Sequence, residues 1–155
     1  MMRKVDEFEF LKIVYTADYR LFEQLSELDR MCIGSEGWSA ESFRSESAKE
    51  NGYVLCYMCG ERVAGLLAGF SAVGEGNITT VAVHPDYRRM GLAESLMKNF
   101  IGLLPEDTEN VFLEVRESNV PAISLYRKIG FEKVGIRKNF YDNPTENAII
   151  MKKEV

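Results

Sequence analysis

The stretch "VAVHPDYRRMGLAESLM", residues 81 to 97, begins as a β-strand and ends as an α-helix. Its first residues are β-branched or small, which is typical of a strand, and Leu92 and Leu96 begin the apolar stripe of a helix. Between the two parts stand Pro85, two consecutive arginines and Gly91. A strand that leads directly into a helix indicates an α/β fold, and we expect the junction to carry a function.

The rest of the chain predicts a β-α-α-β-β-β-α-β-α-β-β order, with hairpins that imply a mixed sheet rather than a purely parallel one. The strands are expected at 8–15, 52–58, 62–73, 76–83, 110–115, 131–138 and 146–153. The helices are expected after Asp18 and at 40–50, 89–104 and 120–129. No repeat, low-complexity segment or linker divides the chain, so residues 1–155 are expected to form a single domain.

Cap residues mark the ends of these helices. Asp18, Ser39 and Asn119 are each placed to accept a hydrogen bond from the first turn of a helix. Gly130 is placed for the left-handed conformation that ends the helix at 120–129. On the helix at 89–104, an apolar stripe is predicted, consisting of Leu92, Leu96, Phe100 and Leu103.

Composition limits the classes of function. The chain is 46% hydrophobic and 28% charged, as in an ordinary soluble globular protein. It has no apolar run near the length of a membrane span and no apolar region at its start, so we expect a cytoplasmic protein without a membrane partner. The net charge of −5 argues against a nucleic-acid partner, which requires a basic face.

Metal and redox chemistry receive little support. "CYMC" at 56–59 has the spacing of half a zinc site, but the chain has only three cysteines and one histidine. A redox pair usually opens a helix, whereas this one lies in a predicted strand. We therefore interpret Cys56 and Cys59 as buried or half-buried thiols and expect no metal site. His84, just past a strand end, is expected to have a structural or solvent role.

The arginines and Gly91 have a physical explanation. The first turn of a helix presents unpaired backbone N–H groups and the positive end of the helix dipole, which together favour an anion such as a phosphate. Gly91 removes a side chain that would keep the phosphate away, Ala93 is nearly as small, and Arg88 and Arg89 add charge at the rim. "RRMGLA" therefore indicates a pyrophosphate cradle. The alternative is a tight strand-to-helix turn with solvated arginines.

A second cluster lies one strand downstream, in "VFLEVRESNVPAISLYRKIGF". Glu114 alternates with apolar residues in the predicted strand. Because burial raises the pKa of a carboxyl group, a glutamate enclosed there by helices would be a candidate general base. The alternative is a surface glutamate paired with Arg116. Tyr126 is either a core aromatic or a proton donor to a departing thiolate, and Asn119 either caps its helix or bonds a ligand amide.

These segments resemble the GNAT superfamily of acyl-CoA-dependent N-acetyltransferases. The matching pieces are "VAVHPDYRRMGLAESL", "FLEVRESNVPAISLYRKIGF" and the pattern R-x-x-G-x-A. Within the superfamily, "LEVRESNVPAISLYRKIGF", "RKNFYDNPTENAIIM" and "GWSAESF" are similar to the bacterial enzymes that acetylate the N-terminal alanine of a small-subunit ribosomal protein. The resemblance implies a mixed, mostly antiparallel sheet of about seven strands flanked by about four helices, with the fourth and fifth strands splayed around the cofactor.

The resemblance also implies roles for individual residues. Glu114 would be the general base and Tyr126 the general acid, and Asn119 would contact coenzyme A. The backbone of Val81, Ala82 and Val83 would pair with the pantetheine arm of acetyl-CoA. The pyrophosphate would be bound by the cradle, which consists of Arg88, Arg89, Met90, Gly91, Leu92, Ala93 and Glu94.

The function implied is transfer of an acetyl group from acetyl-CoA to the N-terminal amine of a protein. Trp38, Phe140 and Tyr141 are candidates to line an open groove for a peptide, or else are ordinary packing residues. Two other functions remain open at this point. One is an acetyltransferase for a small amine, polyamine or antibiotic, and the other is a non-catalytic acyl-CoA-binding module. The oligomeric state is not indicated by the sequence.

Overall fold

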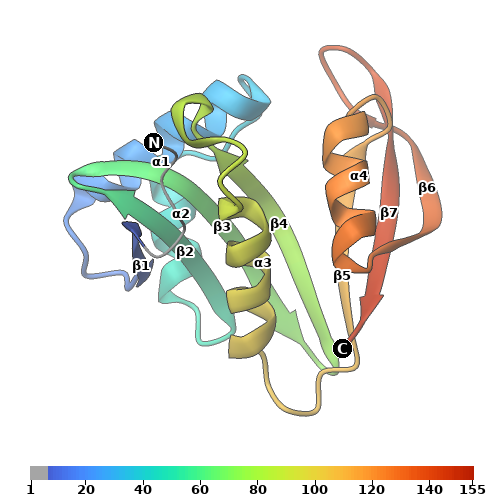
Figure 1. Ribbon diagram of the computed structural model, residues 1–155, viewed down its shortest axis with the longest axis horizontal. Coiled ribbons are helices and arrows are strands. Elements are labelled where there is room, and N and C mark those ends of the chain that lie inside the picture. Colours follow the sequence, from blue (N-terminus) through green and yellow to red (C-terminus); the bar gives the residue numbers. More distant parts are fainter. Residues whose placement is uncertain (1–6) are drawn as a thin grey trace. The chain divides into compact units, whose positions relative to one another are not determined.

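The computed structural model describes residues 7–155, which form an α/β structure with a mixed sheet (Figure 1). The sheet has seven strands in the order β1-β2-β3-β4-β5-β7-β6. The strands are β1 (Glu9–Lys12), β2 (Gly52–Cys59), β3 (Arg62–Ala72), β4 (Glu75–Val83), β5 (Asn110–Arg116), β6 (Glu132–Tyr141) and β7 (Glu146–Glu154). The helices are α1 (Tyr19–Ile33), α2 (Ala40–Ala48), α3 (Leu92–Leu103) and α4 (Val120–Ile129). The predicted fold class and element order are confirmed.

The chain forms two compact units, and β4 passes from one into the other. Within the described residues, unit 1 comprises 7–70 and 79–103, and unit 2 comprises 71–78 and 104–155. The parallel pairing of β4 with β5 lies in unit 2 and joins Glu75–Ile78 to Asn110–Leu113. The strand pairs β1–β2, β2–β3, β5–β7 and β6–β7 are antiparallel, so the sheet is mostly antiparallel, as expected.

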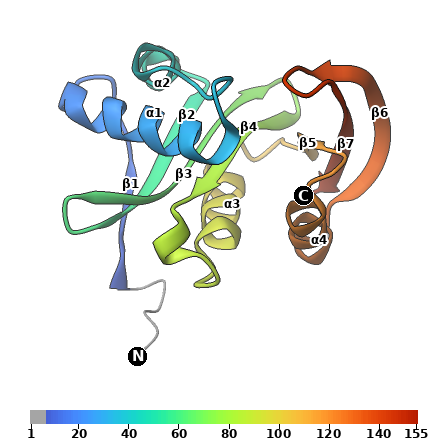
Figure 2. The ribbon, with the colours of Figure 1, turned by 90° about the horizontal axis from the view of Figure 1, so that it is seen from above.

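Unit 1 has helices on both faces of its strands: α1 and α2 on one, α3 on the other (Figure 2). The core under α1 and α2 contains the buried side chains Phe22, Leu25, Phe43, Val54, Leu66 and Ala82. On the α3 face, the Tyr53 ring packs edge-on against Phe100, with 5.4 Å between ring centroids. The Tyr57 hydroxyl lies 2.6 Å from Ser95 Oγ and ties α3 to β2.

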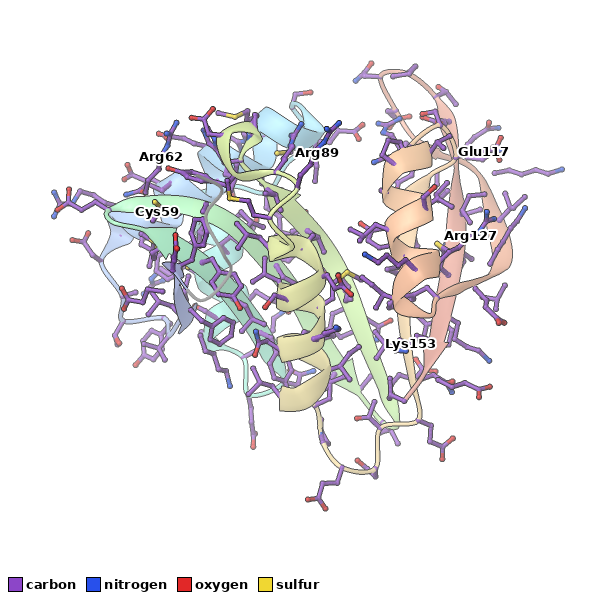
Figure 3. All side chains as sticks on the ribbon, in the orientation of Figure 1. Cys59, Arg62, Arg89, Glu117, Arg127 and Lys153 are labelled. Atoms are coloured by element: carbon purple, nitrogen blue, oxygen red, sulfur yellow. The ribbon has the colours of Figure 1, made fainter. Side chains whose placement is uncertain are left out.

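Unit 2 contains the first part of β4 together with β5, β7 and β6, with α4 on one face. Val111, Leu113 and Val115 are buried and alternate with the half-buried Phe112 and Glu114 along β5. Lys153, opposite Val111 in the register, donates from Nζ to the Ile129 carbonyl at 2.9 Å (Figure 3). Because this contact comes from the Val111 side, α4 covers the face that carries the buried valines and leucine.

The predicted helix caps are confirmed. Asp18 accepts a hydrogen bond from the Arg20 N–H at 3.0 Å, Ser39 from Ser42 at 3.1 Å and Asn119 from Ala122 at 3.2 Å. Gly130 has the left-handed φ of 114°, and its N–H donates to the carbonyls of Arg127 and Tyr126. These local signals were sufficient to predict both ends of α4 correctly, at residues 120 and 129.

Two details of α3 differ from the prediction. The helix begins at Leu92 rather than near Arg89, because Arg89 and Gly91 have φ values of 63° and 81°, which a right-handed helix does not allow. Leu103 is 41% exposed and does not belong to the buried stripe, whereas the next residue, Leu104, is 9% exposed. Leu103 is the last residue of the helix, where the chain already turns away and the helical spacing of buried side chains ends.

Candidate active site

The segment between β4 and α3 has the backbone geometry of a tight, non-helical turn. A short 3-10 turn, Pro85–Tyr87, follows β4, and then Arg89 and Gly91 both take positive φ values. The Gly91 carbonyl accepts the N–H of Ser95 at 3.0 Å, which begins the helical hydrogen-bond ladder of α3. The first N–H groups of α3 therefore follow directly after a glycine, as the anion-cradle interpretation requires.

The two arginines of the segment differ in role. Arg88 turns back toward β4, where its Nε donates to the Val83 carbonyl at 3.2 Å and its Nη2 lies 3.7 Å from Cys32 Sγ. Arg89 is exposed and labelled beside the turn in Figure 3. Arg88 and Arg89 are both exposed and both supply positive charge at the surface of the turn, while Arg88 also holds the turn against the end of the strand.

The other residues of the segment are placed as follows. Leu92 is 1% exposed, so its side chain belongs to the core and only its backbone can face a ligand. Met90, Ala93 and Glu94 are half-buried, and Glu94 forms a 3.4 Å ion pair with Lys98 one turn along α3.

The end of β4 alternates between two environments. Thr80 and Ala82 are buried at 6% and 4% exposure, on the face covered by α1 and α2, whereas Val81 and Val83 are half-buried on the other face. Val83 lies near Gly65, where an added Cβ would meet the Leu96 side chain of α3 at 3.4 Å. The side chains of 81–83 therefore pack within unit 1, and a ligand beside this strand would meet its backbone.

Glu114 lies on β5 with its carboxylate on the face opposite α4. Its side chain is 30% exposed, and Oε1 lies 3.0 Å from the Arg137 Nε on β6. The Arg137 contact differs from the alternative of a surface glutamate paired with Arg116, and the 30% exposure differs from the alternative of full enclosure by helices. The cause is the strand order, which places β7 between β5 and β6, and the pairing of β6 with β7, which brings Arg137 within reach of Glu114.

Tyr126 lies on the side of α4 that packs on the sheet. It is half-buried, and its ring makes an edge contact with Phe131 at 6.2 Å between centroids. Burial raises the pKa of the Tyr126 hydroxyl to about 12. The phenol therefore keeps its proton at neutral pH, which is the state that a general acid needs.

Asn119 is exposed and its Oδ1 accepts the Ala122 N–H, so its side-chain oxygen caps α4. The capping interpretation is confirmed. The expected contact of Asn119 with coenzyme A stays a prediction.

The two catalytic candidates lie on opposite faces of the sheet in unit 2. Along β5 the side chains of Leu113 and Val115 point to the face that α4 covers, and the side chain of Glu114 points to the other face. Burial first, and then the charges of Glu114 and Tyr126, raise the pKa of Tyr141, so both candidates lie near this one residue.

Sequence reasoning missed several polar residues. Arg116 donates to the Pro144 and Asp142 carbonyls and to the Glu146 carboxylate, all on or beside the β6–β7 turn. Its partners are 26 to 30 residues away in the chain, and no local pattern could have indicated them. The guanidinium also lies 4.5 Å from the ring centroid of Tyr141.

Asp29 is a second missed residue, and here a signal existed. It lies within the apolar stripe of α1 and is 0% exposed. It accepts hydrogen bonds from Thr80 Oγ1 at 2.6 Å and from the Trp38 N–H at 2.7 Å. Burial raises the pKa of Asp29, although these two hydrogen bonds act in the opposite direction. A carboxylate at a core position of a helix predicts such a buried polar cluster.

His84 and the cysteines are placed as their structural interpretations require. His84 Nδ1 accepts the Asp86 N–H at 3.1 Å and its Nε2 lies 2.8 Å from Arg62 Nη2. Cys56 is buried, and this burial raises the pKa of its thiol to about 12, so it is unreactive at neutral pH. Cys59 is half-buried.

A mixed seven-stranded sheet with a glycine-containing turn ahead of α3 defines an acyltransferase architecture, and comparison with known proteins identifies it. The Acetyltransferase (GNAT) family model matches residues 15–131, so the chain belongs to the GNAT acetyltransferase family. It is an acetyl-CoA-dependent N-acetyltransferase.

Similar proteins cover most of the chain. A Bacillus subtilis (strain 168) protein, provisionally named a [ribosomal protein bS18]-alanine N-acetyltransferase, is 40% identical over 74% of this chain and 77% of its own length. The [ribosomal protein bS18]-alanine N-acetyltransferase of Escherichia coli (strain K12) is 34% identical over 74% of this chain and 78% of its own. The crystal structure of the ribosomal-protein-S18-alanine N-acetyltransferase from Escherichia coli matches with a TM-score of 0.79 and 27% identity, covering 96% and 94% of the two chains.

The same fold also occurs in a solved structure of lower sequence identity. A GNAT family acetyltransferase from Elizabethkingia anophelis, solved with acetyl-CoA bound, shares the fold at a TM-score of 0.74, with 17% identity over 97% of this chain and 99% of that one. Separately, none of the helices within residues 7–155 combines the length and the apolar character needed to span a membrane.

The cradle assignment predicts the effect of a bulky residue at position 91. We expect Gly91→Leu to weaken acetyl-CoA binding about tenfold, because a left-handed φ costs a residue with a Cβ about 1–2 kcal/mol and the turn must shift away from the phosphate. The measurement is the Kd for acetyl-CoA by calorimetry, with circular dichroism to check the fold. Gly102→Leu is the matched control, since a Cβ there meets nothing within 4 Å. Equal affinities for acetyl-CoA in the two variants would remove the cradle from the site.

Proposed function

We propose that this enzyme transfers the acetyl group of acetyl-CoA to the N-terminal α-amine of a protein, and that the acceptor is the N-terminal alanine of a small-subunit ribosomal protein. The observation that carries the proposal is the 34% identity to the Escherichia coli enzyme, over most of both chains. The presence of Glu114 and Tyr126 in two different elements of unit 2 supports it.

On this proposal, residues 1–155 act as one N-acetyltransferase domain, and acetyl-CoA is a substrate rather than a resident group. Backbone N–H groups of the cradle, from Arg88 to Glu94, bind its pyrophosphate, and the exposed Arg88 and Arg89 supply positive charge. The backbone of 81–83 pairs with the pantetheine arm, and Asn119 contacts coenzyme A. The fit rests on a turn whose glycine has a φ of 81°, directly before a helix N-terminus.

The proposed chemistry is a direct transfer. Glu114 takes a proton from the acceptor ammonium, directly or through water, because only the neutral amine is a nucleophile. The amine nitrogen attacks the thioester carbon, so that a C–N bond forms and the C–S bond breaks, and the nitrogen releases its second proton to solvent. A backbone N–H near Val83 stabilises the oxyanion. Tyr126 gives its proton to the departing thiolate, and the phenolate regains a proton from solvent. No cysteine takes part as a nucleophile.

The acceptor assignment predicts a preference among substrates. We expect a peptide that begins with alanine to be acetylated with a higher kcat/KM than peptides whose only amine is a lysine side chain, and than free spermidine. The α-amine of a peptide loses its proton at a lower pH than a lysine amine does, so more of it is neutral near pH 7. The measurement is steady-state release of coenzyme A across a panel of peptides that differ only in the first residue. Faster turnover of spermidine or an aminoglycoside than of every peptide would contradict the proposal.

A further inference from the structure

Arg116 has an unusual number of partners for a residue at the end of a strand. Its Nη1 donates to the Pro144 carbonyl at 3.1 Å and to Glu146 Oε1 at 3.2 Å, and its Nη2 donates to the Asp142 carbonyl at 2.9 Å. Only 22% of its side chain is exposed. One guanidinium thus fixes the two backbone carbonyls and the carboxylate that shape the turn between β6 and β7.

Glu146 extends this arrangement to the start of α4. Its second carboxylate oxygen accepts the backbone N–H of Ser118, in the segment that connects β5 to α4. The hydrogen bond from Ser118 and then that from Arg116 lower the pKa of Glu146, so it stays charged at neutral pH. The β6–β7 turn is therefore tied both to β5 and to the segment that leads into the Tyr126 helix.

Tyr141 is the aromatic residue that this arrangement holds in place. The Arg116 guanidinium lies 4.5 Å from the centroid of its ring, within cation–π range, and the Phe140 ring makes an edge contact with it at 5.1 Å. Burial first, and then the charge of Glu114, raise the pKa of the Tyr141 hydroxyl to about 12. Tyr141 is thus a neutral hydrogen-bonding group close enough to Glu114 to feel its charge.

Register explains why these residues gather on one face. Glu114 and Arg116 are two residues apart on β5 and so share the face opposite α4. Across β7, Arg137 reaches the Glu114 carboxylate from β6, and Tyr141 lies opposite Glu146 at the end of the same strand. The face around Glu114 is therefore bordered by Arg137 on one side and by Tyr141, held by Arg116, on the other.

We propose that Arg116 is a positioning residue for the acceptor: it holds Tyr141 and the 142–145 turn in place beside Glu114, where the Tyr141 hydroxyl hydrogen-bonds the backbone of the incoming peptide. This inference rests on the proposed role of Glu114 at the acceptor amine. Arg116 itself touches neither the reacting atoms nor acetyl-CoA. Its effect should therefore appear in the KM for the acceptor and act through Tyr141.

The test compares Arg116→Met and Arg116→Lys with the wild type. We expect Arg116→Met to raise the KM for the peptide about tenfold, which corresponds to the loss of one hydrogen bond between Tyr141 and the peptide backbone, while the KM for acetyl-CoA stays within about twofold. Arg116→Lys keeps the positive charge but lacks the planar guanidinium that donates to several acceptors at once. Its KM for the peptide should therefore lie between those of the wild type and Arg116→Met. Arg20→Met is the control, since this exposed arginine at the start of α1 pairs with Asp18, and its two KM values should be unchanged.

A double-mutant cycle with Tyr141→Leu separates positioning from general stability. If Arg116 acts through Tyr141, the double variant should lose little more peptide kcat/KM than Tyr141→Leu alone. Additive losses, an unchanged peptide KM in both Arg116 variants, or an equal rise in the KM for acetyl-CoA would each overturn the proposal. If Arg116→Met does not fold, Arg116→Lys in the same cycle decides it.

The same assays keep this proposal distinct from the proposed function. The wild type is first offered both the alanine peptide and spermidine. If spermidine is the better acceptor, the proposed function fails, and the Arg116 variants are then measured with spermidine, which has no peptide backbone for Tyr141 to bond. A raised KM for spermidine in those variants would show that Arg116 acts in some other way and would overturn the positioning proposal as well.

Discussion

Glu114→Gln should lower kcat/KM for the acceptor by about 10²-fold or more, because glutamine keeps the size and the hydrogen-bonding oxygen but cannot take a proton. The measurements are kcat/KM for the alanine peptide and the Kd for acetyl-CoA, which should not change.

The 3.0 Å contact with Arg137 is the structural complication of this experiment. Glutamine leaves the Arg137 guanidinium without its ionic partner, but both groups are partly exposed to solvent, so the cost in stability is at most about 1 kcal/mol. Glu132→Gln is the matched control, because Glu132 is an exposed glutamate on strand β6. Turnover by folded Glu114→Gln close to that of this control would exclude Glu114 as the base.

Tyr126→Phe should lower kcat by about 10²-fold while leaving the KM for acetyl-CoA nearly unchanged. Phenylalanine keeps the ring packed against Phe131 and removes only the proton donor. The pKa of about 12 means that the wild-type phenol is fully protonated in the neutral range, so the loss should be equally large across that range. Stopped-flow or steady-state release of coenzyme A measures it.

The matched control is Tyr53→Phe, which removes a hydroxyl from another packed tyrosine, one whose ring contacts Phe100 and whose hydroxyl lies 3.5 Å from the Leu103 carbonyl. If Tyr53→Phe and Tyr126→Phe lose the same fraction of kcat, the loss reflects packing and not proton transfer. Retention of wild-type kcat by Tyr126→Phe would mean that the thiolate leaves without this acid.

Local signals were sufficient for most of the fold. The caps Asp18, Ser39 and Asn119, the left-handed Gly130 and the alternation along β5 depend on neighbours a few residues away, and all were predicted correctly. The start of α3 was not, because the residue pattern of a helix continues through Arg89 while the backbone there does not. A positive φ at an arginine has no signature in the pattern of apolar residues.

The candidate site depends on contacts that are distant in the chain, and here prediction from the residues reached less far. One alternative for Glu114 was a pairing with Arg116, two residues away, whereas its carboxylate accepts a hydrogen bond from Arg137, 23 residues away. That pair exists because β7 lies between β5 and β6, and this strand order is not a local property. For the same reason, the contacts of Arg116 with the β6–β7 turn could not be expected.

The placement of Glu114 and Tyr126 on opposite faces of the sheet also has a consequence for how such an enzyme diverges. Along β5, consecutive side chains point to opposite faces, so a mutation on the Glu114 face leaves the packing under α4 intact. On the proposed roles, selection can then change the acceptor by substitutions around Tyr141 and Arg137, with no compensating change around Tyr126. A duplicated gene can thus acquire a new acceptor in small steps while its acid and its helix packing are inherited unchanged.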